Sequence, residues 1–372
     1  MRVALPAVVA SHRHAAPAVS RNRWLRCLAA ALALLLAACS GSSSPRVGGG
    51  TPAAGPRVTV RLGYFANLTH ATAIAGVEQG IFARDLGSNV DLKTAIFNAG
   101  PDEVQALFSG ALDAGYMGPN PALNAYVRSK GAAVRIVSGA TLGGAFFVVR
   151  PEITSAADLK GKKVASPQLG NTQDVALRRW LASQGLKTDQ QGGGDVSVVP
   201  QDNATTLDAF RGGQIAGAWV PEPWATRLLQ EGGGHVLVDE RTLWPNGQYE
   251  TTVLVVATSF QQAHPDAVAR LLRAQVDANG YVNAQPADAQ RVVNAAITRI
   301  TGKALPDAEV AAAWANMTFS NDPAASSLQK AAADAVSLGF LDLGGLDVSK
   351  IYDLQPLNAA LKAAGQPEVA ER

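Results

Sequence analysis

Two short polar segments each lie between a predicted strand and a predicted helix, and they carry the side chains best suited to hold a ligand. They are Tyr64-Phe-Ala-Asn-Leu-Thr-His70 and Ser166-Pro-Gln-Leu-Gly-Asn-Thr-Gln173. Free N–H groups at a helix N-terminus attract anions, and Asn or Thr side chains there cap the helix or donate hydrogen bonds. Two such segments facing one cleft predict a site for a small oxyanion group, with ordinary helix capping as the alternative at each position. The candidate ligand-binding residues are Tyr64, Phe65, Asn67, Thr69, His70, Gly170, Asn171, Thr172 and Gln173.

A repeated turn supports the idea of two matching lobes. Residues 108–121 align without gaps with residues 210–223, and both copies show a helix end, a Gly turn, a short strand and Pro-x-Pro. Proline suits the first turn of a helix, and ligands bind at the carboxyl ends of strands in open α/β sheets. The repeat therefore adds Gly118, Asn120 and Glu222 to the candidates, and a third loop adds Thr141, Gly143 and Gly144.

Aromatic residues are expected near the same cleft, where Tyr64, Phe65, Trp219 and Trp224 would clamp the organic part of a ligand. Ligand pockets are mainly apolar with a few placed polar groups, although a core role fits each of these residues equally well. Glu222 would either hold a ligand ammonium group or bond backbone groups at a helix start, and the second role is favoured.

The sequence shows no machinery for catalysis and no metal-binding pattern. His70, His235 and His264 are scattered without His or Cys partners at metal-ligand spacing. The glycine triplets at 192–194 and 232–234 do not lead into Lys-Ser/Thr, as a phosphate-binding loop would require. We therefore expect no catalytic residue, no metal and no cofactor.

The elements that must position these residues alternate between strands and helices. Strand-like runs lie at 58–64, 90–96, 114–117, 134–138, 146–150, 163–166, 196–199, 217–220, 236–238 and 252–256, with helical patterns between them. From His264 onward the pattern is almost wholly helical, without strand runs. Alternating units of this kind predict an α/β fold with open sheets, and two separate runs predict two sheets.

The amino-acid composition excludes several classes of protein. The 372 residues, 47% hydrophobic and 17% charged, can form a sizeable core. The net charge of +2 gives no sign of the basic patch or stripe that nucleic-acid binding requires. It arises from five arginines in residues 1–38, which contain no acid; without them 27 basic residues face 30 acidic ones. The slight basicity therefore belongs to the N-terminal segment.

The N-terminus has the pattern of a lipoprotein signal. Arg21, Arg23 and Arg26 precede a 12-residue apolar run that ends at Ala38, directly before Cys39. Such a run is too short to span a bilayer and has the size of a signal-peptide core. We expect a signal peptide at 1–38, lipidation of Cys39 and a flexible tether at 39–56, with a plain secretory peptide as the alternative. Residues 1–20 precede a complete basic region, which suggests that the true start lies nearer Arg21.

The chain resembles the substrate-binding proteins of bacterial ABC importers in the nitrate, sulfonate and taurine branch. The resemblance covers roughly residues 57–320 and rests on the segments Arg61–Tyr64, Asn98–Pro101, Ser109–Ala114, Asp158–Lys162 and Trp219–Trp224. It implies a two-lobed, type II periplasmic-binding-protein clamshell with two crossovers and a helical C-terminal region. Lobe one would comprise 57–150 plus 250–372 and lobe two 151–249, with 147–149 and 253–255 as hinge strands.

The function implied by the resemblance is capture of a small solute in the inter-lobe cleft and its delivery to a membrane permease with its ATPase. An aliphatic sulfonate is the preferred ligand, and nitrate, taurine, bicarbonate and a thiamine-precursor pyrimidine remain open. Together with the N-terminal lipoprotein pattern, the resemblance predicts an extracytoplasmic protein that touches the membrane through its lipid only, and we expect a monomer. A metabolite enzyme on the same fold is the alternative from a different class, because fold does not decide function.

Overall fold

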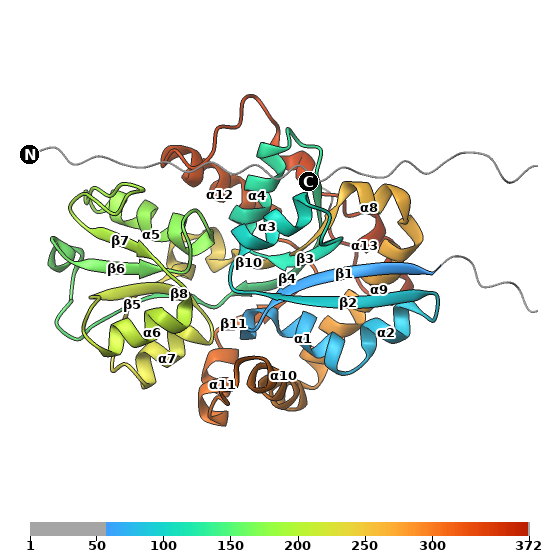
Figure 1. The fold of residues 1–372 in the computed structure, drawn as a ribbon, viewed down its shortest axis with the longest axis horizontal. Helices are drawn as coiled ribbons and strands as arrows, with labels where there is room; N and C mark the ends of the chain where they lie inside the picture. Colours follow the sequence, from blue (N-terminus) through green and yellow to red (C-terminus); the bar gives the residue numbers. More distant parts are fainter. Residues whose placement is uncertain (1–56, 371–372) are drawn as a thin grey trace, which may run out of the picture. The chain divides into compact units, whose positions relative to one another are not determined.

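The computed structural model describes residues 57–370. The expected signal peptide at 1–38, the lipidated Cys39 and the tether at 39–56 lie outside the described residues. Within the described part, the strands form two separate sheets, as the alternating pattern predicts (Figure 1).

The first sheet has six strands, and we call it, with the helices that pack on it, lobe one. Its order is β11 (Met317–Phe319), β4 (Val134–Gly143), β10 (Glu250–Ala257), β3 (Ala114–Met117), β1 (Val58–Phe65) and β2 (Val90–Phe97). Strand β1 pairs in parallel with β2 and β3, whereas β10 runs antiparallel to β3 and β4. Its helices are α1 (Ala71–Glu78), α2 (Ile81–Leu86), α3 (Gly100–Phe108), α4 (Pro119–Arg128), α8 (Thr258–Ala263), α9 (Pro265–Ala284), α10 (Pro286–Thr301), α11 (Asp307–Trp314), α12 (Ala325–Ser337) and α13 (Gln355–Ala363), with the short turns η1 (Leu68–His70) and η5 (Val348–Ile351).

The second sheet has five strands and defines lobe two. Its order is β7 (Ser197–Pro200), β6 (Lys163–Ser166), β8 (Gly217–Pro221), β5 (Ala145–Val149) and β9 (His235–Asp239). Strand β6 is parallel to β7 and β8, and β5 is antiparallel to β8 and β9. The helices are α5 (Thr172–Ser183), α6 (Asn203–Arg211) and α7 (Trp224–Gln230), with the turns η2 (Ala156–Leu159), η3 (Glu240–Leu243) and η4 (Pro245–Gly247).

The chain first crosses between the sheets earlier than expected, and it returns to the first sheet at Glu250. Strand β4 ends at Gly143 in lobe one, and β5 starts at Ala145 in lobe two, so the first crossing occupies Gly143 and Gly144. Both glycines have positive φ, 75° and 74°, which explains why glycine is needed at this bend. The expected end of lobe one at residue 150 is therefore corrected, because Phe147–Val149 pair with β8 and β9. Residues 253–255 lie within β10 of lobe one and pair with β3 and β4.

Another correction concerns the C-terminal region. The sequence predicts no strand after His264, but Met317–Phe319 form β11, paired antiparallel with β4 at Thr141–Gly143. Three residues are too few to show an alternating pattern. The edge pairing therefore depends on the long β4, which extends well beyond the expected strand at 134–138.

The cores follow the strands. All eight residues of β10 are buried, and Val253–Val256 supply branched side chains to the core of lobe one. In lobe two, separate clusters cover the two faces of the sheet, one around Phe147 and Trp219 and the other around Phe146 and Phe210. Alternate residues of β5 thus point to opposite faces, as a strand requires.

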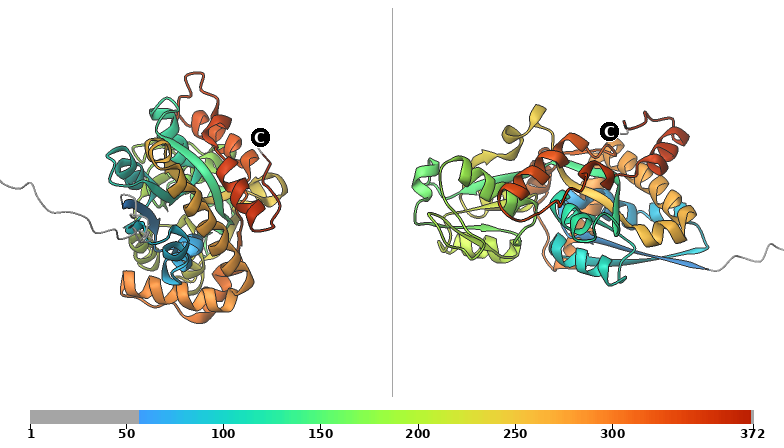
Figure 2. Two further views of the ribbon diagram at one scale, coloured as in Figure 1. Left: turned by 90° about the vertical axis from the view of Figure 1, so that its right-hand side faces the viewer. Right: turned by 90° about the horizontal axis from the view of Figure 1, so that it is seen from above.

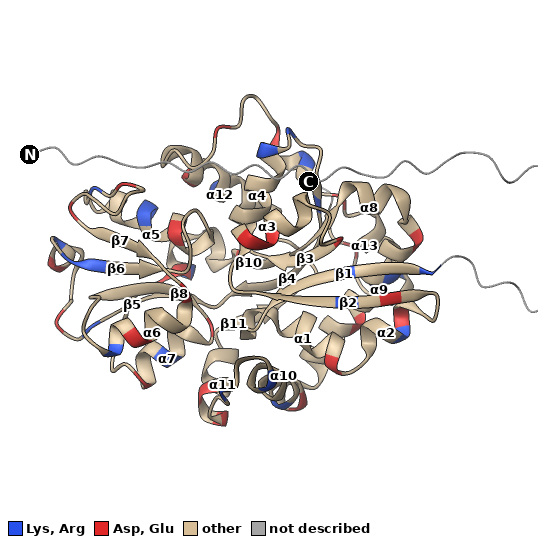
Figure 3. Ribbon diagram, viewed as in Figure 1, with Lys and Arg blue, Asp and Glu red and all other residues tan. Residues whose placement is uncertain are grey.

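Helices from the C-terminal region of lobe one also reach lobe two. Helix α12 packs on both α4 and α5, and α11 packs on α7. Figure 2 shows these red and orange segments passing alongside both sheets. Residues of both charge signs are interspersed over the helices of both lobes (Figure 3). Among residues 57–370, no helix is both long enough and apolar enough to cross a membrane.

Candidate functional site

The segment Tyr64–His70 follows strand β1 and leads through η1 into α1. The expected capping by Asn67 or Thr69 is wrong, because neither η1 nor α1 receives a side-chain cap. Instead, Asn67 Oδ1 accepts a hydrogen bond of 2.9 Å from Nε1 of Trp224, which lies in lobe two. The carbonyl of Thr69 accepts a bond of 2.7 Å from the Thr141 hydroxyl, so that hydroxyl is already occupied. Asn67 therefore links the two lobes.

His70 is a buried and neutral part of the same segment. The residue is 2% exposed, its ring packs on Phe65 with centroids 4.3 Å apart, and burial lowers its pKa to about 3. Nδ1 accepts a hydrogen bond of 3.3 Å from the Phe65 N–H. Since a neutral imidazole carries one N–H, the hydrogen must then reside on Nε2. His70 can thus donate a hydrogen bond without carrying a charge.

The segment Ser166–Gln173 of lobe two has a different construction. Asn171 caps α5 as expected, because its Oδ1 accepts a 2.9 Å bond from the N–H of Asp174. Gly170 has a φ of 73°, a conformation that disfavours other residues, and its N–H donates to Asp174 Oδ2 at 2.9 Å. The loop is therefore bent around the carboxylate of Asp174.

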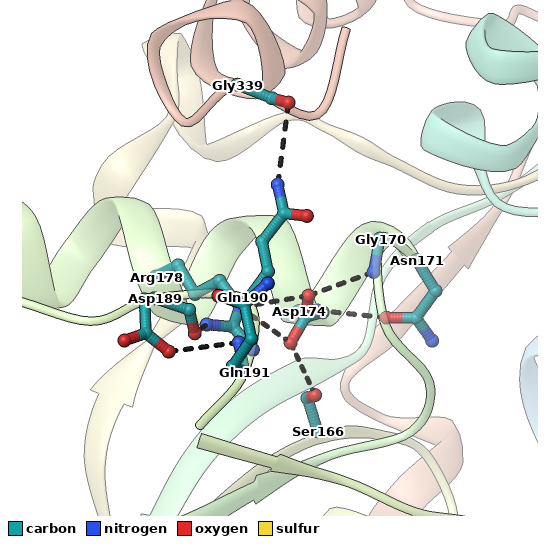
Figure 4. A network of polar contacts seen from close by, with 9 residues as sticks. All are labelled: Ser166, Gly170, Asn171, Asp174, Arg178, Asp189, Gln190, Gln191 and Gly339. Atoms are coloured by element: carbon teal, nitrogen blue, oxygen red, sulfur yellow. Dashed lines mark hydrogen bonds and ion pairs between the residues drawn. The ribbon is translucent and has the colours of Figure 1, made fainter. Parts of the chain in front are cut away.

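A buried ion pair fixes that carboxylate (Figure 4). Arg178 Nε lies 3.1 Å from both oxygens of Asp174, and the Ser166 hydroxyl donates to Asp174 Oδ1 at 2.7 Å. The side chains of Asp174 and Arg178 are 0% and 2% exposed. Arg178 also donates to the carbonyl of Asp189. The network therefore joins the end of β6, the loop and the first turns of α5 into one unit.

The two segments meet at a small cavity of about 30 Å³ between the lobes. Thr172 lines it, and the Thr172 hydroxyl is buried and has no hydrogen-bond partner among the described residues. A β-carbon built onto Gly118 would lie 2.2 Å from that hydroxyl, so glycine permits the approach of the two lobes here. The cavity has room for a small polar group rather than a whole ligand. Its lining includes eight expected residues: Phe65, Asn67, Thr69, His70, Gly118, Asn171, Thr172 and Gln173.

A larger cavity of about 290 Å³ adjoins the small one, and we call it the chamber. Phe65, Asn67, Asn98 and Asn203 line both cavities. Trp224, which the sequence singles out, also lines the chamber. The other lining residues of the chamber are Ala66, Phe97, Asp202, Ala204, Leu207, Asp208, Pro223, Arg227, Ile297, Thr301, Lys303 and Leu305.

Some expected site residues lie elsewhere. Trp219 is fully buried in the core of lobe two, where it stacks on Phe147 and donates to a Glu240 carboxylate oxygen at 2.7 Å. Glu222 is also fully buried and accepts bonds from Thr226 and Asn316, which matches the favoured structural role. Burial raises the pKa of Glu222. Tyr64, Asn120, Thr141, Gly143, Gly144 and Gly170 line neither cavity.

Sequence reasoning missed several lining residues. Asn98 follows β2 and Asn203 follows β7, so a consistent search at the carboxyl ends of parallel strands would have found both. Ile297 and Leu305 come from the α10–α11 region, where apolar residues at helical spacing give no hint that they face a cavity. No group of three or more His, Cys, Asp or Glu side chains within the described residues could hold a metal ion.

Comparison with known proteins assigns the family. The model of the NMT1-like family matches residues 53–297, which is more than half of the chain. This chain belongs to the NMT1-like family. Among its relatives is a Brucella abortus (strain 2308) protein named as a binding protein without a stated solute; it is 32% identical over 233 residues, 62% of this chain and 68% of the relative. The taurine-binding periplasmic protein of Escherichia coli (strain K12) is 29% identical over 208 residues, 55% of this chain and 61% of that protein.

Solved structures show the fold. The alkanesulfonate-binding protein of Xanthomonas axonopodis, bound to MOPS, superposes with a TM-score of 0.63 at 21% identity, covering 77% of this chain and 95% of that one. The nitrate-binding protein of Synechocystis gives 0.67 at 17% identity, covering 84% and 90%. The expected type II periplasmic-binding-protein fold and the expected family are therefore confirmed.

Proposed function

We propose that this protein is the extracytoplasmic solute-binding component of an ABC importer and that it captures an aliphatic sulfonate between its lobes. One observation carries the choice of solute: a small cavity lined by Thr172 and His70 adjoins a larger chamber, to whose wall Phe97, Leu207 and Ile297 contribute apolar side chains. A sulfonate has a compact anionic head and an organic tail, and each part matches one cavity. Periplasmic binding proteins for taurine, sulfonates and nitrate among the relatives and structural neighbours support the general role.

The small cavity suits an oxyanion that stays ionised at all relevant pH values. The unpartnered Thr172 hydroxyl and the neutral His70 supply hydrogen-bond donors, and Thr172 also begins helix α5, whose N-terminal dipole favours an anion. Directly after the second segment, the charges of Asp174 and Arg178 compensate each other. A sulfonate needs no protonated partner, so donors of this kind are sufficient.

The chamber suits an apolar tail because three of its four charged lining residues already have protein partners. Arg227 and Lys303 both pair with Glu231, and Asp202 caps α6 through Thr205. Asp208 is exposed. Phe97, Leu207 and Ile297 contribute apolar surface to the wall. Nitrate or bicarbonate would leave this chamber unused, which favours a ligand with a tail.

The remaining parts of the proposal concern the cell envelope. We infer cleavage before Cys39, lipidation of that residue and a tether that extends to residue 56, followed by the two lobes. Removing the signal peptide leaves an anchored receptor that meets the permease and its ATPase at the membrane surface. We propose that it acts as a monomer and that it releases its solute unchanged, as expected of a binding protein.

The test is isothermal titration calorimetry of the purified protein with a series of n-alkanesulfonates from methane- to hexanesulfonate. Each methylene that enters the chamber should tighten binding by about threefold to fourfold. Nitrate, taurine, bicarbonate and a thiamine-precursor pyrimidine complete the panel and should bind more weakly than hexanesulfonate. Tightest binding of nitrate, or binding of no sulfonate, would reject the proposed solute.

A matched pair of variants checks that the tail occupies the chamber. Ala204 and Thr205 are adjacent exposed residues at the start of α6, but only Ala204 lines the chamber. Ala204→Trp should weaken hexanesulfonate binding while sparing methanesulfonate, and Thr205→Trp should leave both affinities near the wild-type values. Equal effects of the two variants would place the tail outside the chamber.

A further inference from the structure

A segment of lobe one rests on the Ser166–Gln173 loop of lobe two. Helix α12 packs on α5 of lobe two, and Asp334 of α12 pairs with Arg179 of α5 at 3.1 Å. The chain then continues through Gly339, whose carbonyl accepts a bond of 3.4 Å from Nε2 of Gln190 (Figure 4). The next residue, Phe340, therefore lies at the surface of lobe two.

The half-buried ring of Phe340 makes two contacts there. The guanidinium carbon of Arg178 lies 5.8 Å from the centre of the ring, within the range of a cation–π interaction. A β-carbon built onto Gly170 would lie 3.4 Å from Cδ1 of Phe340, so the ring packs directly against this glycine. Phe340 thus touches both the loop and the arginine that holds the loop in place.

Gly170 has no side chain with which to anchor itself. Its N–H donates a hydrogen bond to Asp174, and the ring of Phe340 packs against it. Asn171 and Thr172 follow directly in the chain; both line the small cavity, and the buried Thr172 hydroxyl has no hydrogen-bond partner among the described residues. A displacement of Gly170 would therefore move the donors at the start of α5.

We propose that Phe340 is a positioning residue for the oxyanion site, through which lobe one holds the Gly170–Thr172 loop of lobe two. It does not line either cavity, so its effect on a ligand acts through Gly170 and Arg178. This inference rests on the proposed function for the identity of the ligand.

The test compares Phe340→Ala with Phe108→Ala. Phe108 has a guanidinium, that of Arg128, 5.2 Å from its ring, but both of these residues belong to lobe one. With hexanesulfonate as the probe, Phe340→Ala should raise Kd about fivefold, about 1 kcal/mol, mainly through faster dissociation. Phe108→Ala should leave Kd unchanged, and Phe340→Tyr should restore it. A wild-type Kd for Phe340→Ala would overturn the proposal.

A second measurement does not depend on the ligand. Hydrogen exchange in peptides covering residues 166–174 should be faster in ligand-free Phe340→Ala than in wild type, because the loop loses its cover. Phe108→Ala should leave these peptides unchanged. Equal exchange in all three proteins would overturn the positioning role even if the probe binds. Failure of hexanesulfonate to bind wild-type protein would reject the proposed solute, while the exchange result still decides the role of Phe340.

Discussion

The two loops that meet at the small cavity are similar in sequence pattern but are stabilised in different ways. Each follows a parallel strand, carries Asn and Thr, and leads into a helix. In lobe two, a buried Asp174–Arg178 ion pair holds the loop, and Asn171 caps the helix. In lobe one, the neutral ring of His70 accepts a hydrogen bond from the backbone N–H of Phe65, and Asn67 accepts one from Trp224 of lobe two. A shared pattern of strand, polar loop and helix therefore does not specify how the loop is fixed.

This difference has an electrostatic consequence. Each loop reaches neutrality by its own route, one by pairing two charges and the other by burying an uncharged imidazole. Neither loop places a free cation in the small cavity, and its lining contains no Lys or Arg. An anion bound there would depend on hydrogen-bond donors and the dipole of α5. Such a site should select by shape and hydrogen bonding more than by charge alone.

The largest effect is expected from breaking the ionic anchor of lobe two. Arg178→Met leaves the buried Asp174 carboxylate without its partner, which should lower the free energy of unfolding by about 3–5 kcal/mol. Arg179 is the neighbouring residue, 45% exposed and paired with Asp334 at 3.1 Å. Arg179→Met should therefore cost less than about 1 kcal/mol. Urea unfolding of both variants measures the difference, and similar losses would show that the buried pair is not the anchor.

The second largest effect is expected on ligand binding at the same loop of lobe two. Thr172→Val preserves the shape of the side chain but removes its donor, and a hydrogen bond to a charged group contributes about 1.5–3 kcal/mol. Hexanesulfonate should then bind about 10-fold to 100-fold more weakly, as measured by calorimetry. The control is Thr206→Val in α6, whose hydroxyl is also buried and unpartnered but lines neither cavity. An unchanged affinity for Thr172→Val would remove Thr172 from the site.

Some of these features could be predicted from the sequence, and others could not. Strand periodicity, together with the rule that ligands bind at the carboxyl ends of strands, predicted both loops and eight residues of the small cavity. These signals are local, because they depend only on residues that are adjacent in the sequence. The sequence could not place Trp219, because period-two alternation does not reveal which face of β8 meets the core and which the cleft. It also missed the contribution of α10 and α11 to the chamber. That wall depends on how distant segments pack, which no local pattern records.

The smallest effect is expected for the pH dependence of stability that comes from the neutral His70 in the loop of lobe one. His70 takes up a proton near its ordinary pKa of 6.5 when unfolded but only near pH 3 when folded, because burial disfavours the charged ring. Acid therefore favours the unfolded chain, and stability is lost as the pH falls from about 6.5 toward 3. Between pH 7 and pH 5.5, this group should lower the free energy of unfolding by about 1 kcal/mol.

Urea unfolding across this pH range, in wild type and His70→Gln, measures the contribution, since glutamine offers the Phe65 N–H an acceptor that does not titrate. The variant should lose stability less steeply on acidification. His264→Gln, which replaces a half-buried histidine outside both cavities, serves as the control. Identical slopes for wild type and His70→Gln would mean that His70 is not held neutral. The two loops would then differ less than their contacts indicate, because ionised side chains would hold both.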